Sequence, residues 1–292
     1  MNLREEARRL REKFHASQQR VCGLLEMAVS SYRYRTRRSD AALRERLVEL
    51  ARKKPRFGYR RLHLYLDKIA PHVNHKRVFR VYRAAGLAVR RKARKRLVRE
   101  GSPRPALTAA NQAWAVDFVH DAVASGRAIR VLSMVDEYTR ECLTLEVDTS
   151  FASRRVTRAL EKILIEREKP LTLRCDNGPE FTSRHFLAWC LEQGIELVHI
   201  PPGKPQQNGY VESFNGKMRD ECLNVSWFEN LWDARRKIAA WQQEYNEERP
   251  HSALGYQTPA AFARQLAPCS GSVPLRGTPP EQGVPEQSVH VV

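Results

Sequence analysis

Five short apolar runs between residues 114 and 200 constrain the fold more than any other feature of this chain. They have the length and the β-branched or aromatic content of strands, and they occupy residues 114–120, 129–138, 142–148, 171–176 and 195–200. The first three follow one another with short connections, whereas helical patterns at about 152–167 and 183–193 separate the others. Hairpins followed by strand and helix in alternation predict an α/β fold, a mixed five-stranded sheet with flanking helices.

Three carboxylates occur where a solvated surface charge is not expected. Asp117 interrupts the first apolar strand, Asp176 ends the fourth, and Glu212 lies at the edge of an apolar helical stripe. An ionised carboxylate in or beside a sheet is costly unless a cation or a proton compensates it. Mg²⁺ takes oxygen ligands, and two such ions can assist phosphoryl transfer, so the three acids together indicate a metal site. Each acid alone would equally suit an N-cap, a turn or a salt bridge.

The net charge of +18 is confined to the first third of the chain. Residues 1–100 hold 30 basic and 9 acidic side chains, whereas the other 192 residues hold 21 and 24. Such a basic block indicates a polyanionic partner, because neutralising phosphates releases counterions. An anionic membrane is the rival partner, but no apolar run approaches the ~18 residues of a membrane span. We therefore expect nucleic acid as the partner and no membrane association.

The first of two predicted helical units is weakly marked. Val21, Leu24 and Leu25 lie on one face of a predicted helix, and the pattern restarts near Ser30. This arrangement is compatible with a small helix-turn-helix over residues 17–35. Any short helical pair packed on a neighbour would show the same pattern.

The second helical unit has clearer boundaries. One helix is predicted near 59–69, and Asn74 is a natural N-cap for another helix that ends before Gly86. Basic side chains recur opposite the apolar face of this last helix, and more follow it. Given the charge excess around them, we interpret these as DNA contacts: Lys76, Arg77, Arg80, Arg83, Arg91 and Lys92.

A basic run and a Ser/Pro-containing linker place the main domain boundary near Ala106. The predicted parts are an N-terminal helical segment (1–50), a basic helical DNA-binding domain with its linker (51–105), the sheet-containing core with a C-terminal helix (106–266), and a disordered tail (267–292).

Cysteine spacing and the N-terminal residues argue against a zinc-binding, a disulfide-rich and a secreted protein. The six cysteines show no two-residue spacing and no paired His–Cys set, so neither a zinc site nor a disulfide framework is indicated. The charged opening, with Arg4, Glu5 and Glu6, does not suit a secretory signal. We therefore expect reduced, mostly buried thiols and a cytoplasmic protein.

Several motifs carry a resemblance to a known family. WAVDFVH, DNGPEF and HIPPGKPQQNGYVESFNGKMRDECLN resemble the catalytic core of insertion-sequence transposases and retroviral-type integrases. Asp176 and Glu212 have 35 residues between them, the spacing of that group's two-aspartate, one-glutamate signature. GYRRLH, VNHKRVFRVYRAAGL and YNEERPHSALGYQTPAAF extend the match over roughly residues 17–265. The chain is thus similar to the second-reading-frame transposases of the IS-three family.

This resemblance implies a ribonuclease-H-like core that cleaves and transfers DNA strands at the ends of an insertion sequence. Asp117, Asp176 and Glu212 would be the catalytic residues and the ligands of two Mg²⁺ ions, for which Mn²⁺ can substitute. The implied partners are double-stranded DNA (terminal inverted repeats and target), further copies of the chain on DNA, and a subunit encoded by an upstream frame. The implied location is the bacterial nucleoid.

The resemblance also implies DNA contacts in the core. Arg219 matches a basic residue seven positions after the family's glutamate, where it could hold a phosphate, and Lys217 is a second candidate. The segment 201–209 resembles a flexible loop that orders on DNA, with candidate contacts at Lys204, Gln206 and Asn208.

Two departures from the family pattern are visible. Glu26 replaces a usual turn glycine and Ala28 a usual capping serine in the first helical pair, which argues against a regular DNA-reading unit there. The zinc module of the retroviral relatives is absent.

Two rival functions use the same features. A DNA-binding protein without catalytic activity would occupy element ends, but retention of all three acids argues against it. A structure-selective nuclease on the same fold would transfer strands only to water and would form no joined products. A recombinase with a Ser or Tyr nucleophile is disfavoured, because in-line displacement needs only positioning and charge stabilisation.

Overall fold

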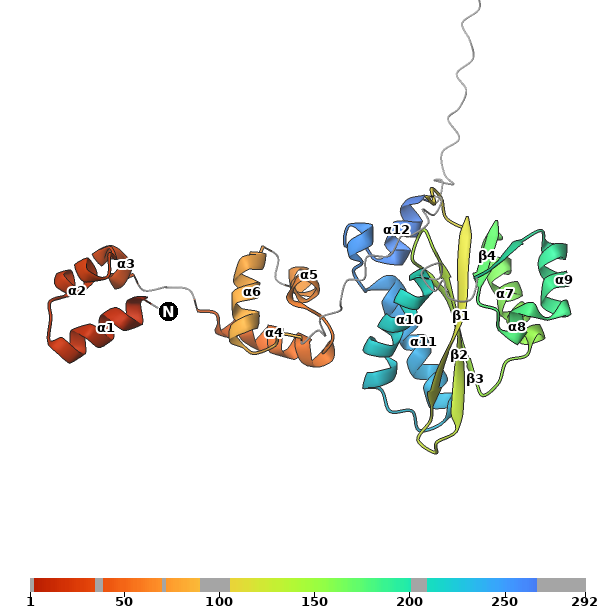
Figure 1. The fold of residues 1–292 in the computed structure, drawn as a ribbon, viewed down its shortest axis with the longest axis horizontal. Coiled ribbons are helices and arrows are strands. Elements are labelled where there is room, and N and C mark those ends of the chain that lie inside the picture. Colours follow the sequence, from red (N-terminus) through yellow and green to blue (C-terminus); the bar gives the residue numbers. More distant parts are fainter. Residues whose placement is uncertain (1–2, 35–38, 70–71, 90–105, 201–208, 267–292) are drawn as a thin grey trace, which may run out of the picture. The chain divides into compact units, whose positions relative to one another are not determined.

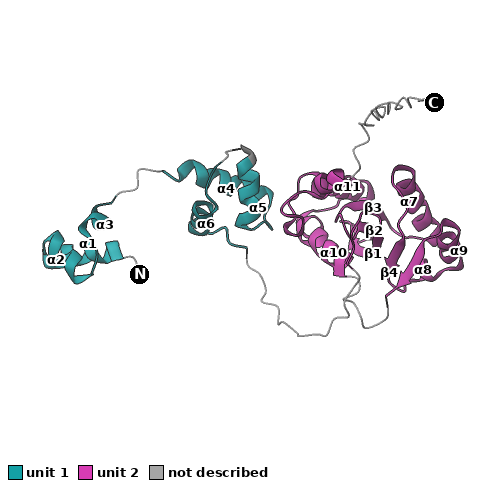
Figure 2. Ribbon diagram, turned by 90° about the horizontal axis from the view of Figure 1, so that it is seen from above, with its two compact units in different colours: residues 1–94 teal, residues 95–292 magenta. Residues whose placement is uncertain are grey.

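The computed structural model describes residues 3–34, 39–69, 72–89, 106–200 and 209–266. It divides the chain into two compact units, residues 1–94 and 95–292 (Figure 2). The predicted tail, from residue 267 onward, lies outside the described residues. None of the helices within the described ranges has the length and apolar content needed to cross a membrane.

A mixed five-stranded sheet forms the centre of the second unit (Figure 1). Its strands are β1 (Ala113–Ala122), β2 (Ala128–Asp136), β3 (Cys142–Asp148), β4 (Thr172–Cys175) and β5 (Glu196–His199), in the order β3-β2-β1-β4-β5. The pairs β1–β2 and β2–β3 are antiparallel, whereas β4 is parallel to both β1 and β5. The predicted strands and their mixed pairing are confirmed, with every strand end within two residues of its predicted position.

Helices cover both faces of this sheet (Figure 1). The helices of the unit are α7 (Ser153–Glu166), α8 (Pro179–Thr182), α9 (Arg184–Gln193), α10 (Gly209–Glu221), α11 (Leu231–Glu247) and α12 (Pro259–Leu266), with 3-10 turns η2 (Leu223–Val225) and η3 (Ser252–Leu254). Helices α10 and α11 pack on one face, and α7, α8 and α9 pack on the other. The layers are therefore helix, sheet, helix, as the strand and helix alternation predicts.

Side chains of β1 point alternately to the two faces of the sheet and pack into the core on each face. Ala115 and Val119 pack with α10 and α11, whereas Trp114 and Val116 pack with α7 and α9. Because side chains two residues apart point to the same side of a sheet, Asp117 lies on the α10 face. The strand thus positions one polar side chain in a row of apolar ones.

In the first unit the helices are α1 (Leu3–Phe14), α2 (Gln18–Leu24), α3 (Val29–Arg33), α4 (Ala41–Lys53), α5 (Tyr59–Ile69) and α6 (His75–Ala84). The two helices predicted at 59–69 and after Asn74 are confirmed, and the Asn74 side chain accepts a hydrogen bond from Lys76 N at 2.8 Å. Leu47 of α4 shares a core with Leu62 and Val78. The boundary placed after residue 50 therefore falls inside α4.

Helices α2 and α3 match the predicted helical pair. Val21 is buried, but Leu24 is 72% exposed, because α2 ends there and buries Cys22 instead. The turn has Glu26 at a φ of +50°, a conformation that favours glycine, and Ala28 gives α3 no side-chain cap. Both departures inferred from the sequence thus fall at the positions where the turn and the cap occur.

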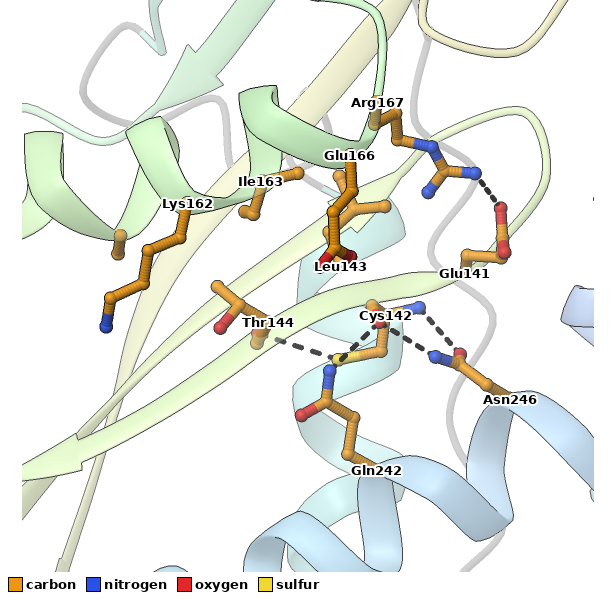
Figure 3. Close-up of a pocket in the computed structure, with 11 residues that line it drawn as sticks. Glu141, Cys142, Leu143, Thr144, Lys162, Ile163, Glu166, Arg167, Gln242 and Asn246 are labelled. Carbon is orange, nitrogen blue, oxygen red and sulfur yellow. Dashed lines mark hydrogen bonds and ion pairs between the residues drawn. The ribbon is translucent and has the colours of Figure 1, made fainter.

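The edge strand β3 is covered by side chains of α11 (Figure 3). Cys142 N donates to Asn246 Oδ1 at 2.9 Å, and Asn246 Nδ2 donates back to Cys142 O at 2.9 Å. Gln242 Nε2 also donates to Cys142 O, at 3.1 Å. The Asn246 amide thus pairs with both backbone groups as a neighbouring strand would, which satisfies this part of the sheet edge.

We expect Asn246→Leu to lower the free energy of unfolding of the second unit by about 2 kcal/mol, because it leaves a strand N–H without its partner. Urea unfolding followed by tryptophan fluorescence measures this directly, since all five tryptophans lie beyond residue 113. The control is Gln243→Leu at an exposed position of the same helix. Equal losses for the two variants would contradict the edge-capping role.

Candidate active site

Asp117 is held in the middle of β1 by three hydrogen-bonding neighbours. Its Oδ1 accepts from Phe118 N and its Oδ2 from Asn215 Nδ2, both at 2.8 Å. Its backbone oxygen accepts from Ser133 Oγ at 3.1 Å, across the β1–β2 pair in which the two residues face each other. The bonds from Phe118 and Asn215 set the direction of the half-buried carboxylate.

The parallel pairing of β4 with β1 brings Asp176 toward Asp117. Ala115 pairs with Arg174, so extending this register by two residues places Asp176 beside Asp117. Asp176 is exposed just after β4, and its Oδ1 accepts from Gly178 N at 3.0 Å. A Cβ on Gly178 would lie 3.0 Å from that same oxygen, so a larger residue here would require the Asp176 carboxylate to shift.

Glu212 lies in the first turn of α10, which packs on the same face of the sheet. The apolar stripe of this helix, Val211, Phe214 and Met218, is buried as predicted, and Glu212 beside it is exposed. Asn215 is three residues later and thus on the same side of the helix as Glu212. Because Asn215 bonds Asp117, the helix face that carries Glu212 is directed at β1.

Burial and the two other acids act on the ionisation of Asp117. Burial, and to a smaller extent the charges of Asp176 and Glu212, raise the pKa of Asp117 from its ordinary value near 3.8 to about 6, against the lowering effect of the hydrogen bonds from Phe118 and Asn215. No set of three His, Cys, Asp or Glu side chains within the described ranges surrounds a single point where an ion could bind. Asp117 thus has two acidic neighbours, Asp176 and Glu212.

Two polar residues near Asp117 were missed by sequence reasoning. Ser133 is fully buried and Asn215 is 7% exposed, and Ser133 Oγ donates to Asn215 Oδ1 at 2.9 Å. Each interrupts an apolar stretch, as Asp117 does, so the same signal could have found them. They connect β2, β1 and α10.

Both ends of α10 are fastened to other elements. At its start, the guanidinium carbon of Arg140 lies 3.7 Å from the ring centroid of Tyr210. At its end, Arg249 Nε and Nη2 pair with the two oxygens of Glu221 at 2.6 and 2.7 Å. The side chain of Arg249 is only 2% exposed. The helix that carries Glu212 is thus fixed to the sheet and to the segment after α11.

The predicted DNA contacts fall into two groups. In the core, Arg219 is exposed and donates to His120 O at 3.3 Å, and Lys217 is half-buried. On α6, Lys76 and Arg83 are exposed, whereas two other cations pair with Asp40: Arg77 at 2.7 Å and Arg80 at 2.7 Å. The remaining candidates lie outside the described residues: Arg91, Lys92, Lys204, Gln206 and Asn208.

The cysteines and the cavity of Figure 3 play no part in this site. Five cysteines are described, and all five are buried free thiols, as expected. The cavity is lined by residues of β3, α7 and α11 and includes none of the three acids.

Family models match most of the described chain. Two described as an integrase core domain match residues 108–205 and 193–259, and one described as an HTH-like domain matches residues 37–96. The first two span every strand of the sheet and the positions of the three acids. The third spans α4, α5 and α6.

Similar proteins come from bacterial insertion elements. An uncharacterised 31.7 kDa protein of insertion element IS407 from Burkholderia multivorans is 46% identical over 257 residues, which cover 87% of this chain and 93% of the relative. A 39.2 kDa protein of IS476 from Xanthomonas euvesicatoria is 46% identical over 89% of this chain and 76% of the relative. Transposase InsD for insertion element IS2D of Escherichia coli is 29% identical over 74% and 76%.

Among solved structures, the catalytic core domain of HTLV-2 integrase in complex with magnesium is 20% identical, with a TM-score of 0.44 over 53% of this chain and 97% of that one. The family assignment rests instead on the matching models and on the insertion-element relatives. They confirm the ribonuclease-H-like core and the helical unit before it that the resemblance implied. The chain belongs to the insertion-sequence transposases of the IS-three family, with an integrase-type core.

Proposed function

We propose that this chain cleaves DNA at the ends of an insertion sequence and joins the ends to target DNA, using Asp117, Asp176 and Glu212. One observation carries the proposal: Asp117 is half-buried, and its pKa is raised by burial and by the other two acids. A cation bound among the three acids would compensate the charge of the half-buried Asp117 carboxylate. Such a cluster in an integrase-type core supports a polynucleotidyl transferase.

The donor set fits Mg²⁺, which prefers carboxylate oxygens. Asp117, Asp176 and Glu212 would hold two such ions. When bound, the ions would activate the attacking oxygen and stabilise the leaving one, and Mn²⁺ would serve in place of Mg²⁺.

The protein's own contribution is positioning. Asn215 bonds the Asp117 carboxylate, and Ser133 bonds both Asn215 and the backbone oxygen of Asp117. Arg140 and Arg249 hold the two ends of α10. In-line attack by water or a DNA 3′-hydroxyl then needs no covalent link between protein and DNA. Arg219 is suited to hold a phosphate near the exposed end of β1.

The proposed reaction requires DNA and further protein subunits as partners. The basic part before residue 106 binds the terminal repeats, and the core (106–266) binds the scissile strand and the target duplex. Pairing two ends requires at least two copies of the chain, together with a subunit from the upstream frame. The site of action is the bacterial nucleoid, in the cytoplasm.

Strand cleavage and joining on linear DNA that carries the element's own ends, with Mg²⁺ and the upstream subunit, tests the proposal. Cut and joined products with wild type, both absent with Asp176→Asn, would support it. Cut products without joined products would indicate a nuclease instead of a transposase. Binding without reaction by either protein would replace it with a DNA-binding function.

We expect Asn215→Ala to lower the cleavage rate by about 10- to 100-fold, because Asp117 loses the partner that orients it. DNA affinity should stay within about two-fold of wild type, since Asn215 is buried and faces the acid. Single-turnover cleavage beside a binding assay separates the two effects. The matched control is Asn224→Ala, an exposed asparagine just beyond α10. Wild-type cleavage by Asn215→Ala would contradict this positioning role.

A further inference from the structure

The exposed face of α6 carries a single sign of charge and one large apolar side chain. The buried side chains of this helix are Val78, Val81 and Tyr82, and the exposed ones are His75, Lys76, Phe79, Arg80, Arg83 and Ala84. The helix contains no acidic residue. A face of this kind is complementary to the phosphates of a nucleic acid.

Phe79 is distinctive on that face. It is 40% exposed, and across the described part of residues 39–89 it is the one large apolar side chain that is exposed. A lone exposed apolar side chain is ordinary on a protein surface. This one, however, lies one helical turn from both Lys76 and Arg83, in the centre of the basic row.

Two neighbours hold the Phe79 ring in place. Its centroid lies 4.8 Å from that of Tyr59 on α5, and the guanidinium carbon of Arg83 lies 5.9 Å from it. An aromatic ring fixed in this way loses little side-chain entropy when it binds a partner. The ring is therefore presented outward rather than used as core.

The cations around Phe79 differ in whether an acidic side chain pairs with them. Arg77 and Arg80 both form ion pairs with Asp40, the residue that precedes α4. No acidic side chain in the described residues pairs with Lys76 or Arg83. Two cations thus flank Phe79 along the helix, where they can contact phosphates on either side of a groove.

We propose that Phe79 is a specificity-determining residue whose ring contacts the 5-methyl group of a thymine in the terminal repeat. This inference rests on the proposed binding of element ends. The major groove of B-DNA admits an α-helix, and the thymine methyl is the apolar group that it exposes. With Lys76 and Arg83 on phosphates, Phe79 is the large apolar side chain on the exposed face of α6, and it can distinguish thymine without a hydrogen bond.

A uridine scan of the end DNA tests this inference with the full chain. Each thymine is replaced in turn by deoxyuridine, which lacks only the methyl group, and affinity is measured by fluorescence anisotropy without metal so that no cleavage occurs. Wild type should lose about four-fold in affinity at one or two positions, the equivalent of one methyl group leaving an apolar contact. Phe79→Ala should bind more weakly and lose that position-specific effect.

Lys76→Ala is the matched control on the same face. It should weaken binding to all probes equally and keep the uridine-sensitive positions, because a phosphate contact carries no base information. A wild-type preference for end DNA with no uridine-sensitive position would overturn the inference and leave the proposed strand transfer intact. The same sensitive position in Phe79→Ala would also overturn it. If wild type shows no preference for end DNA, the inference and the proposed end binding both fail.

Discussion

Replacing Asp117 with asparagine is expected to abolish strand cleavage and, at the same time, to make the metal-free protein more stable at neutral pH. The loss of cleavage should exceed about 10³-fold, because one of the carboxylates that would hold the proposed ions is gone. The gain in stability follows from the pKa of Asp117, which the fold raises to about 6. Asparagine keeps an acceptor for Phe118 N without a buried charge.

The pH dependence of this effect has a definite sign. The folded protein holds the Asp117 proton more tightly than the unfolded chain, so this group favours folding most below about pH 4. The contribution is lost as the pH rises through about 6, and it amounts to at most about 3 kcal/mol. Asp117→Asn should therefore raise the free energy of unfolding by about 1–2 kcal/mol at pH 7.5 and by nothing near pH 4.

Urea unfolding of the metal-free proteins at the two pH values measures this prediction, with Asp121→Asn, further along the same strand, as the control. Added Mg²⁺ should stabilise wild type and leave Asp117→Asn unchanged. An Asp117→Asn protein that is less stable than wild type at pH 7.5 would contradict this prediction. So would an Asp117→Asn protein that Mg²⁺ stabilises as much as it stabilises wild type.

Arg249→Met is expected to cause the largest loss of stability of any single change considered, about 3–5 kcal/mol. Arg249 is almost fully buried, and it pairs with both oxygens of Glu221 at the end of α10. Removing the guanidinium leaves the Glu221 carboxylate, itself only 10% exposed, without that partner. Cleavage should fall with stability, since this pair fixes the helix that carries Glu212.

The double variant Glu221→Leu with Arg249→Met separates the ion pair from simple packing. Apolar side chains in place of a buried pair often restore stability, so the double variant should lie within about 1–2 kcal/mol of wild type. Tryptophan fluorescence during urea unfolding follows this unit alone. If the stability loss of the double variant equals the sum of the losses of the two single variants, the ion pair itself does not contribute to stability.

The sheet could be predicted from the sequence because its signals are local. The apolar runs of β1 to β5 are short and bounded by turns, and Asn74 and Gly86 bracket α6. Asp117 stood out because a charge inside an apolar run is costly, whereas Asp176 and Glu212 were assigned through the motifs and the 35-residue spacing of the resemblance. Placing Asp176 beside Asp117, by contrast, required the resemblance, since the parallel pairing of β1 with β4 joins segments far apart in the chain.

Contacts between distant residues were beyond local reasoning. The pairing of Arg77 and Arg80 with Asp40 joins residues 37 and 40 positions apart, so a row of arginines looked like one uniform DNA-binding face. Ser133 and Asn215 are 82 positions apart. Periodicity placed Leu24 on the apolar face of its helix, but it does not reveal that α2 ends at that residue and leaves the side chain exposed.

The central claim is tested most directly by strand joining with Glu212→Gln, on pre-cut element ends with Mg²⁺ and at protein concentrations that give equal DNA occupancy. Asp220→Asn, an exposed acid on the same helix, is the control. We expect Asp220→Asn to join ends as wild type does and Glu212→Gln to bind them without forming joined product. Joining by Glu212→Gln at the wild-type rate would contradict the assignment of the three acids.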